Sequence, residues 1–72
     1  MIAIVKEDVK KVSTCGKYFE ILYDYADVFY DTQSGNVKIH NRFTAYAYTR
    51  KATDDEKIVI GKLWHEFISR KE

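Results

Sequence analysis

The sequence has few of the residues that break or cross-link a chain: no proline, three glycines and one cysteine, Cys15, among 72 residues. A lone cysteine excludes an intramolecular disulfide and a metal site built from cysteines. Long apolar runs are also missing, because the longest, Ile2-Ala3-Ile4-Val5, is far too short for a membrane span or for the core of a signal peptide. We therefore expect a cytoplasmic protein that has no membrane partner and is held together by its apolar core.

A strong excess of one charge is absent too. The net charge is +1, from 12 basic and 11 acidic residues, whereas a dedicated duplex-DNA binder usually carries a basic excess. The sequence contains no glycine-rich phosphate loop, no nucleophile elbow and no metalloprotease helix motif. It therefore predicts a protein that is not an enzyme, with no catalytic residues, no metal ligands, no cofactor and no small-molecule substrate.

Aromatic residues, in contrast, are plentiful. Six tyrosines, four phenylalanines and one tryptophan make up 15% of the chain, and hydrophobic residues make up 46%. A domain this short buries only about 60% of its unfolded surface, so large aromatic side chains make an efficient core. The composition argues against intrinsic disorder and predicts one folded domain over residues 1–72.

The clearest local pattern is the start of a helix at Thr53. Thr53-Asp54-Asp55-Glu56 has the spacing of a capping box, in which the threonine hydroxyl and the glutamate carboxylate each accept a backbone N–H of the other residue. Acidic residues open the segment and Arg70-Lys71 close it, which suits the helix dipole at both ends. The apolar residues that follow recur at helical spacing and form one stripe: Val59, Ile60, Leu63, Trp64 and Phe67. We predict an amphipathic helix over residues 53–71.

Residues 1–50 are predicted to form an antiparallel meander sheet of four to five strands. The expected strands cover residues 2–5, 9–14, 17–25 continuing into 27–31, 37–42 and 43–49. The second segment also fits a helical turn, and the last two segments also fit one long bent strand. We expect a bulge or bend near Ala26, where the alternation of apolar residues shifts, and turns at Gly16 and Gly35.

The predicted fold class is α+β, with the sheet either open or curled into a small barrel and the C-terminal helix packed on one face. Ala45 and Ala47 share a side with Val37 and Ile39 and leave room above them, so the apolar stripe of the helix is expected there. In that position Trp64→Ala would destabilise the fold by about 3–5 kcal/mol. A small curled sheet followed by a helix resembles, in outline, archaeal chromatin proteins and other SH3-like barrels, but the net charge of +1 departs from the strongly basic chromatin proteins.

The opposite side of the last two strands carries the main candidate binding site. Its members are aromatic or basic and alternate along the chain: Lys38, His40, Arg42, Tyr46, Tyr48 and Arg50. Tyrosine and arginine are enriched at protein-binding hot spots, and the same mixture suits stacking on single-stranded bases beside phosphate contacts. Cross-strand pairs that merely stabilise the sheet would look the same in the sequence.

The outer face of the helix is a secondary candidate interface. Ile58 lies well off the apolar stripe, and Gly61 points away from it at a cost of roughly 1 kcal/mol relative to alanine. Contact with a second chain would explain both residues, and so would neutral drift of the sequence.

Two functions follow from these patterns. The first is a small non-enzymatic protein-binding module, possible also as a homodimer, that occludes a surface of another protein, as accessory or inhibitor proteins of phages and mobile elements do. The alternative is a nucleic-acid-binding domain that uses the aromatic-basic face.

Overall fold

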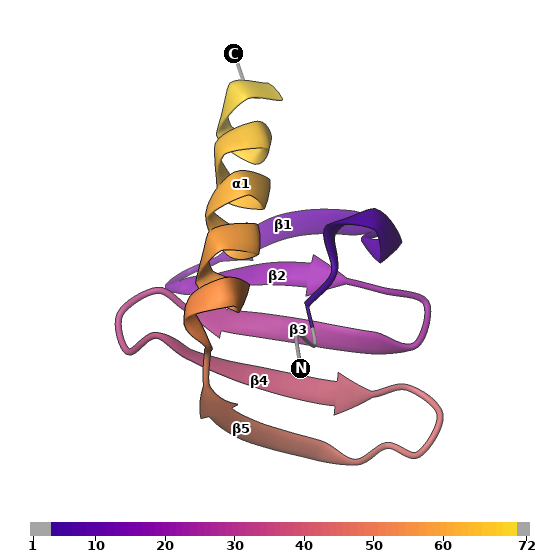
Figure 1. Cartoon of the computed structure of the whole chain (residues 1–72). Helices are drawn as coiled ribbons and strands as arrows, with labels where there is room; N and C mark the ends of the chain where they lie inside the picture. Colours follow the sequence, from indigo (N-terminus) through magenta and orange to yellow (C-terminus); the bar gives the residue numbers. More distant parts are fainter. Residues whose placement is uncertain (1–3, 71–72) are drawn as a thin grey trace.

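The structure, a computed structural model, describes residues 4–70 and consists of a five-stranded antiparallel sheet and a C-terminal helix (Figure 1). In chain order the elements are the short 3₁₀ helix η1 (Lys6–Asp8), the strands β1 (Lys11–Cys15), β2 (Tyr18–Leu22), β3 (Ala26–Asp31), β4 (Asn36–Asn41) and β5 (Ala47–Lys51), and the helix α1 (Asp54–Arg70). The sheet order is β1-β2-β3-β4-β5, so the predicted α+β class and meander topology are confirmed. The sheet is open and does not close into a barrel.

The strand boundaries differ from the predicted ones in three places, one of which is the last predicted strand, 43–49, found at 47–51 as β5. Residues 2 and 3 of the first predicted strand lie outside the described residues, and Ile4 and Val5 are not in a strand. The bend predicted near Ala26 is a complete chain reversal, closed by a hydrogen bond from the Tyr23 N–H to the Ala26 carbonyl. The sequence did not predict this hairpin because its turn contains neither glycine nor proline. The predicted strand at 9–14 forms as β1, and the two glycine turns have positive φ, 59° at Gly16 and 80° at Gly35.

One face of the sheet carries the core. Strand residues alternate between the two faces, and directly opposed residues of neighbouring strands share a face. The buried strand residues therefore lie together on one face, and the helix and the N-terminal segment cover them: Phe19, Ile21, Ala26, Val28, Val37 and Ile39 from the strands, Ile60 and Leu63 from α1, and Ile4, Tyr23 and Ala52 from the connecting segments.

The helix does not lie above Ala45 and Ala47 as predicted. It runs across the strands and projects past β1 (Figure 1), and Trp64 and Phe67 pack on the Phe19 ring with centroid separations of 5.2 and 6.0 Å. Ala45 lies in the β4–β5 turn with φ 61°, and Ala47 is exposed.

The turn explains the error. Residues 42–46 connect β4 to β5, and the register pairs His40 with Ala47 and Ile39 with Tyr48. An even-numbered residue of β5 therefore shares its face with an odd-numbered residue of β4. The prediction assumed unbroken alternation from 37 to 50, which placed every residue of β5 on the wrong face.

An ion pair between a half-buried arginine and a buried glutamate joins β5 to the start of α1. Both oxygens of Glu56, which is fully buried, accept hydrogen bonds of 2.7 Å from the Arg50 guanidinium, and Oε1 also accepts the Thr53 N–H at 2.9 Å. The Glu56 N–H in turn donates to the Thr53 hydroxyl at 3.1 Å, which confirms the predicted capping box. The hydrogen bond from Arg50 to the Glu56 carboxylate raises the pKa of the guanidinium above its ordinary value. The same carboxylate thus caps the helix and attaches it to the sheet.

Removing one member of this pair should be far more costly than replacing both. Arg50→Met leaves the buried Glu56 carboxylate without its cation, for which we expect a loss of about 3–5 kcal/mol in the free energy of unfolding. The double variant Arg50→Met/Glu56→Leu should recover most of that loss, because it leaves no uncompensated buried charge. Urea denaturation followed by circular dichroism measures both. A loss below about 1 kcal/mol for Arg50→Met would match an exposed ion pair and contradict the structure.

Alkaline pH should destabilise the protein through Tyr23. Its hydroxyl is buried near the backbone of Val5 and has no hydrogen-bond partner of good geometry among residues 4–70. Burial raises the pKa of Tyr23 from 10.0 to about 12. Because the folded state favours the neutral phenol, this contribution to stability is complete below pH 10 and disappears as the pH rises towards 12.

Thermal denaturation between pH 7 and 12 tests this dependence. Tyr23→Phe should be at least as stable as the wild type at pH 7 and should lose less stability at alkaline pH. Tyr46→Phe alters an exposed ring and is the matched control, expected to follow the wild type. Equal alkaline losses in all three proteins would refute the assignment.

Candidate binding surfaces

The six residues of the predicted aromatic-basic face do not share one face. Lys38 and His40 lie on the face without the helix, opposite Thr49 and Ala47. Tyr48 and Arg50 are paired with Ile39 and Val37, so they lie on the face that carries the core. The single-face arrangement was therefore wrong for the reason given above for the β4–β5 turn. A binding role for the residues themselves stays a prediction.

Two of the six are engaged in ion pairs inside the protein. Arg50 holds Glu56, and Arg42 contacts Asp27 Oδ1 through Nε at 2.8 Å and Nη2 at 2.6 Å. Tyr46 and Tyr48 form a tilted pair with ring centroids 5.7 Å apart, and their exposed fractions are 63% and 40%. The tyrosines are thus accessible, whereas the two arginines already have carboxylate partners.

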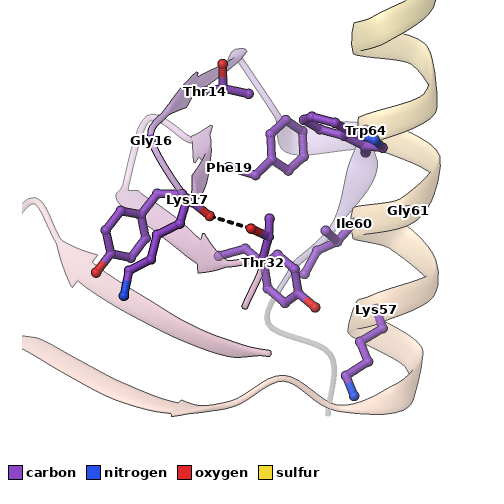
Figure 2. A pocket seen from close by; sticks show the side chains of 11 residues that line it. Thr14, Gly16, Lys17, Phe19, Thr32, Lys57, Ile60, Gly61 and Trp64 are labelled. Atoms are coloured by element: carbon purple, nitrogen blue, oxygen red, sulfur yellow. Dashed lines mark hydrogen bonds between the residues drawn. The ribbon is translucent and has the colours of Figure 1, made fainter. Parts of the chain in front are cut away.

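A groove with a volume of about 530 Å³ lies between α1 and the β1–β2 turn (Figure 2). The wall towards the sheet consists of Phe19, Tyr30 and the turn around Gly16, and the wall towards the helix consists of Ile60, Gly61 and Trp64. Hollows of 300–1,000 Å³ with mainly apolar walls are typical of sites that take up a ligand or a partner's side chain.

Gly61 lines the groove on the helix side. A Cβ atom added at this position would meet no atom within 4 Å, so the backbone there is bare and faces open space. Alanine would fit without a clash and would favour the helix by roughly 1 kcal/mol. Packing inside this chain therefore does not require glycine at position 61. The sequence alone offered no reason for a glycine here, whereas the structure places it in the wall of the groove.

The rim of the groove is polar and basic at one end. Lys17 and Lys57 both line it, and Figure 2 shows them on opposite walls, one from the hairpin and one from the helix. Lys17 forms an ion pair with Asp31 at 3.2 Å, and the hydrogen bond to that carboxylate raises the pKa of the lysine. The Thr32 hydroxyl donates to the Lys17 carbonyl at 2.7 Å and fixes the turn (Figure 2).

The two residues of the predicted secondary interface lie on neighbouring parts of α1. Gly61 lines the groove, whereas Ile58 lies outside it and is 58% exposed. Trp64 and Ile68 add further exposed apolar surface to the same helix, at 41% and 40%. Sequence periodicity assigned Trp64 to the core stripe, and only its partial burial in the structure shows that it also forms a wall of the groove.

The described residues were also compared with the requirements of a metal site and of a membrane-spanning helix. Residues 4–70 contain no group of three or more histidine, cysteine, aspartate or glutamate side chains placed to hold a metal ion. None of the helical segments within that range has the length and apolar character needed to cross a bilayer.

Comparison with known proteins gives no information about function. No protein-family model, no curated protein and no solved structure matches this chain.

Substitutions in the two walls of the groove should separate its structural part from its accessible part. Phe19 is 1% exposed and Trp64 is 41% exposed, although their rings are in edge-to-face contact. Phe19→Ala should cost about 3–5 kcal/mol, whereas Trp64→Ala should cost about 1–2 kcal/mol, less than the value expected from the sequence. Chemical denaturation of both variants checks this order, and an equal or larger loss for Trp64→Ala would contradict the observed packing.

Proposed function

We propose that this protein is a small non-enzymatic protein-binding module and that the groove between α1 and the β1–β2 turn takes up an apolar side chain of the partner. The observation that carries the proposal is Gly61, a glycine in a helix interior whose bare backbone opens onto a groove with walls of Phe19, Ile60 and Trp64. Such a glycine weakens the helix by roughly 1 kcal/mol, and space for a partner side chain accounts for its presence.

The composition of the groove favours a protein partner over nucleic acid. Its walls are aliphatic and aromatic, and aromatic anchors in a desolvated pocket dominate protein–protein binding energy. Single-stranded nucleic acid requires a track of free cations beside stacking rings. On the predicted aromatic-basic face Arg42 and Arg50 are already paired with carboxylates.

The biological role consistent with this site is the occlusion of a surface on another protein. Small accessory and inhibitor proteins of phages and mobile elements act in this way, and a cytoplasmic location would suit the lone, exposed Cys15. Both the origin and the compartment are part of the proposal.

Filling the groove should abolish binding without harming the fold. A random peptide library displayed on phage would be selected on the immobilised protein, and the affinity of enriched peptides would be measured by fluorescence anisotropy. Gly61→Leu should weaken binding at least about tenfold, equivalent to 1.4 kcal/mol, because its side chain occupies the groove. The same variant should be as stable as the wild type or more so, since leucine favours the helix.

Ser69→Leu is the matched control, because it adds the same side chain to an exposed position of α1 outside the groove. It should bind the selected peptides like the wild type. Selected peptides that bind Gly61→Leu and the wild type equally well would refute the groove as the site, and a failure to enrich any peptide would count against the protein-binding function. A mobility shift of single-stranded DNA at low salt would instead favour the nucleic-acid alternative.

A further inference from the structure

β5 is an edge strand with free backbone groups. It pairs only with β4 among the described strands. The Asn41 N–H donates to the Tyr46 carbonyl, and the Ala52 N–H donates to the Gly35 carbonyl. Since hydrogen-bonded positions alternate along an antiparallel pair, Tyr48 and Arg50, which lie between these two hydrogen bonds, direct their backbone groups towards β4. The backbone groups of Ala47, Thr49 and Lys51 therefore point away from the sheet.

The two edges of the sheet differ in what lies beside them. Helix α1 crosses the sheet and extends past β1, whereas no described strand or helix extends past β5 (Figure 1). At one end of β5 the Arg50 guanidinium donates to the Lys51 carbonyl at 3.1 Å and occupies that acceptor. The outward groups of Ala47 and Thr49 are the ones that an additional strand would use.

The side chains around this edge differ between the two faces of the sheet. On the face without the helix, the exposed Lys38 is paired with Thr49, and Lys51 follows on the same face of β5. On the other face lie the rings of Tyr46 and Tyr48, which contact each other and are both exposed. One face of the edge is therefore basic and the other is aromatic.

We propose that the β5 edge binds an extended segment of a partner protein as a sixth strand, and that this segment alternates acidic and apolar residues. In a strand added to β5, successive side chains point to opposite faces. The acidic residues would then lie beside Lys38 and Lys51, and the apolar residues would pack on Tyr46 and Tyr48. The main-chain hydrogen bonds to Ala47 and Thr49 supply part of the affinity, and the alternation supplies the specificity.

The positive charge of Lys38 and Lys51 favours an acidic partner strand over a second copy of this chain. β5 has the sequence Ala-Tyr-Thr-Arg-Lys and contains no carboxylate. Pairing two β5 strands would bring Lys38 and Lys51 of both copies to one face without an opposing charge, which is unfavourable. An acidic strand neutralises the same lysines. This interface uses no residue of the α1 groove, so it does not depend on the proposed function of that groove.

Proline at position 49 isolates the edge hydrogen bond. The Thr49 N–H points away from β4, so Thr49→Pro removes the outward donor without removing a hydrogen bond of the sheet. Thr49→Ala keeps the donor and is the matched control. The probe is a synthetic heptapeptide of alternating valine and aspartate, titrated into ¹⁵N-labelled protein, and the readout is the amide chemical shifts and the hydrogen exchange of Ala47 and Thr49.

The wild type and Thr49→Ala should show saturable shifts along β5, and in the wild type the amides of Ala47 and Thr49 should exchange more slowly with peptide. Thr49→Pro should bind about tenfold more weakly or not at all. The charge variant Lys38→Glu/Lys51→Glu should reverse the preference, binding a valine–lysine heptapeptide in place of the valine–aspartate one. This second variant keeps the test decisive if the proline variant fails to fold.

Three results would overturn the proposal. They are equal affinity of the valine–aspartate peptide for Thr49→Pro and Thr49→Ala, an unchanged preference in the double lysine variant, and the absence of any saturable shift on β5. Dimers of the wild type in sedimentation velocity that disappear in Thr49→Pro would show that the edge takes a second copy instead, contrary to the charge argument.

Discussion

The ion pair between Arg50 and Glu56 is the interaction on which the arrangement of this protein depends most. It is fully buried on the glutamate side, and it joins the last strand to the first turn of the helix. A buried carboxylate is tolerated only where hydrogen bonds and a cation compensate for lost solvation. Glu56 has these partners only when β5 and the capped start of α1 are both in place. The pair therefore fixes where the helix leaves the sheet.

From that point the helix runs towards β1, where apolar contacts rather than an ion pair to β5 hold it on the sheet. Trp64 and Phe67 pack on Phe19, and Lys6 in η1 forms an ion pair with Glu66 that lowers the pKa of this carboxyl. Between these two attachments the helix passes beside the β1–β2 turn. The groove lies between this turn and the helix, and Gly61 is one of its lining residues. The candidate site is thus a consequence of how the helix is held at both ends.

Much of this fold follows from local patterns in the sequence. Thr53 and Glu56 predicted the start of the helix because a capping box involves only residues close in the chain. The meander followed from alternation and from glycines at two of its turns. The position of the helix could not be predicted in the same way, because it depends on the face that each residue of β5 occupies. The register across the β4–β5 turn reversed that assignment, and the turn includes Ala45 at φ 61°, a conformation that alanine does not announce in the sequence.

For the candidate sites too, the sequence predicted the residue types but not their arrangement in space. Composition identified tyrosines and basic residues near the end of the sheet, but they are distributed over two faces of β4, β5 and the turn between them, and both arginines form internal ion pairs. The groove involves residues far apart in the sequence, from the β1–β2 turn and from the middle of α1. Its only local trace was Gly61, a residue that weakens a helix without any benefit visible in the sequence.

Occupation of the groove by a partner is tested most directly by an amide shift map of ¹⁵N-labelled protein with a saturating library-selected peptide. If the peptide binds in the groove, the largest shifts fall on residues 14–19 and 57–64, together with the indole N–H of Trp64, while the far face of the sheet is unaffected. Saturable binding with shifts elsewhere, and none at Gly61 or Trp64, would contradict occupation of the groove.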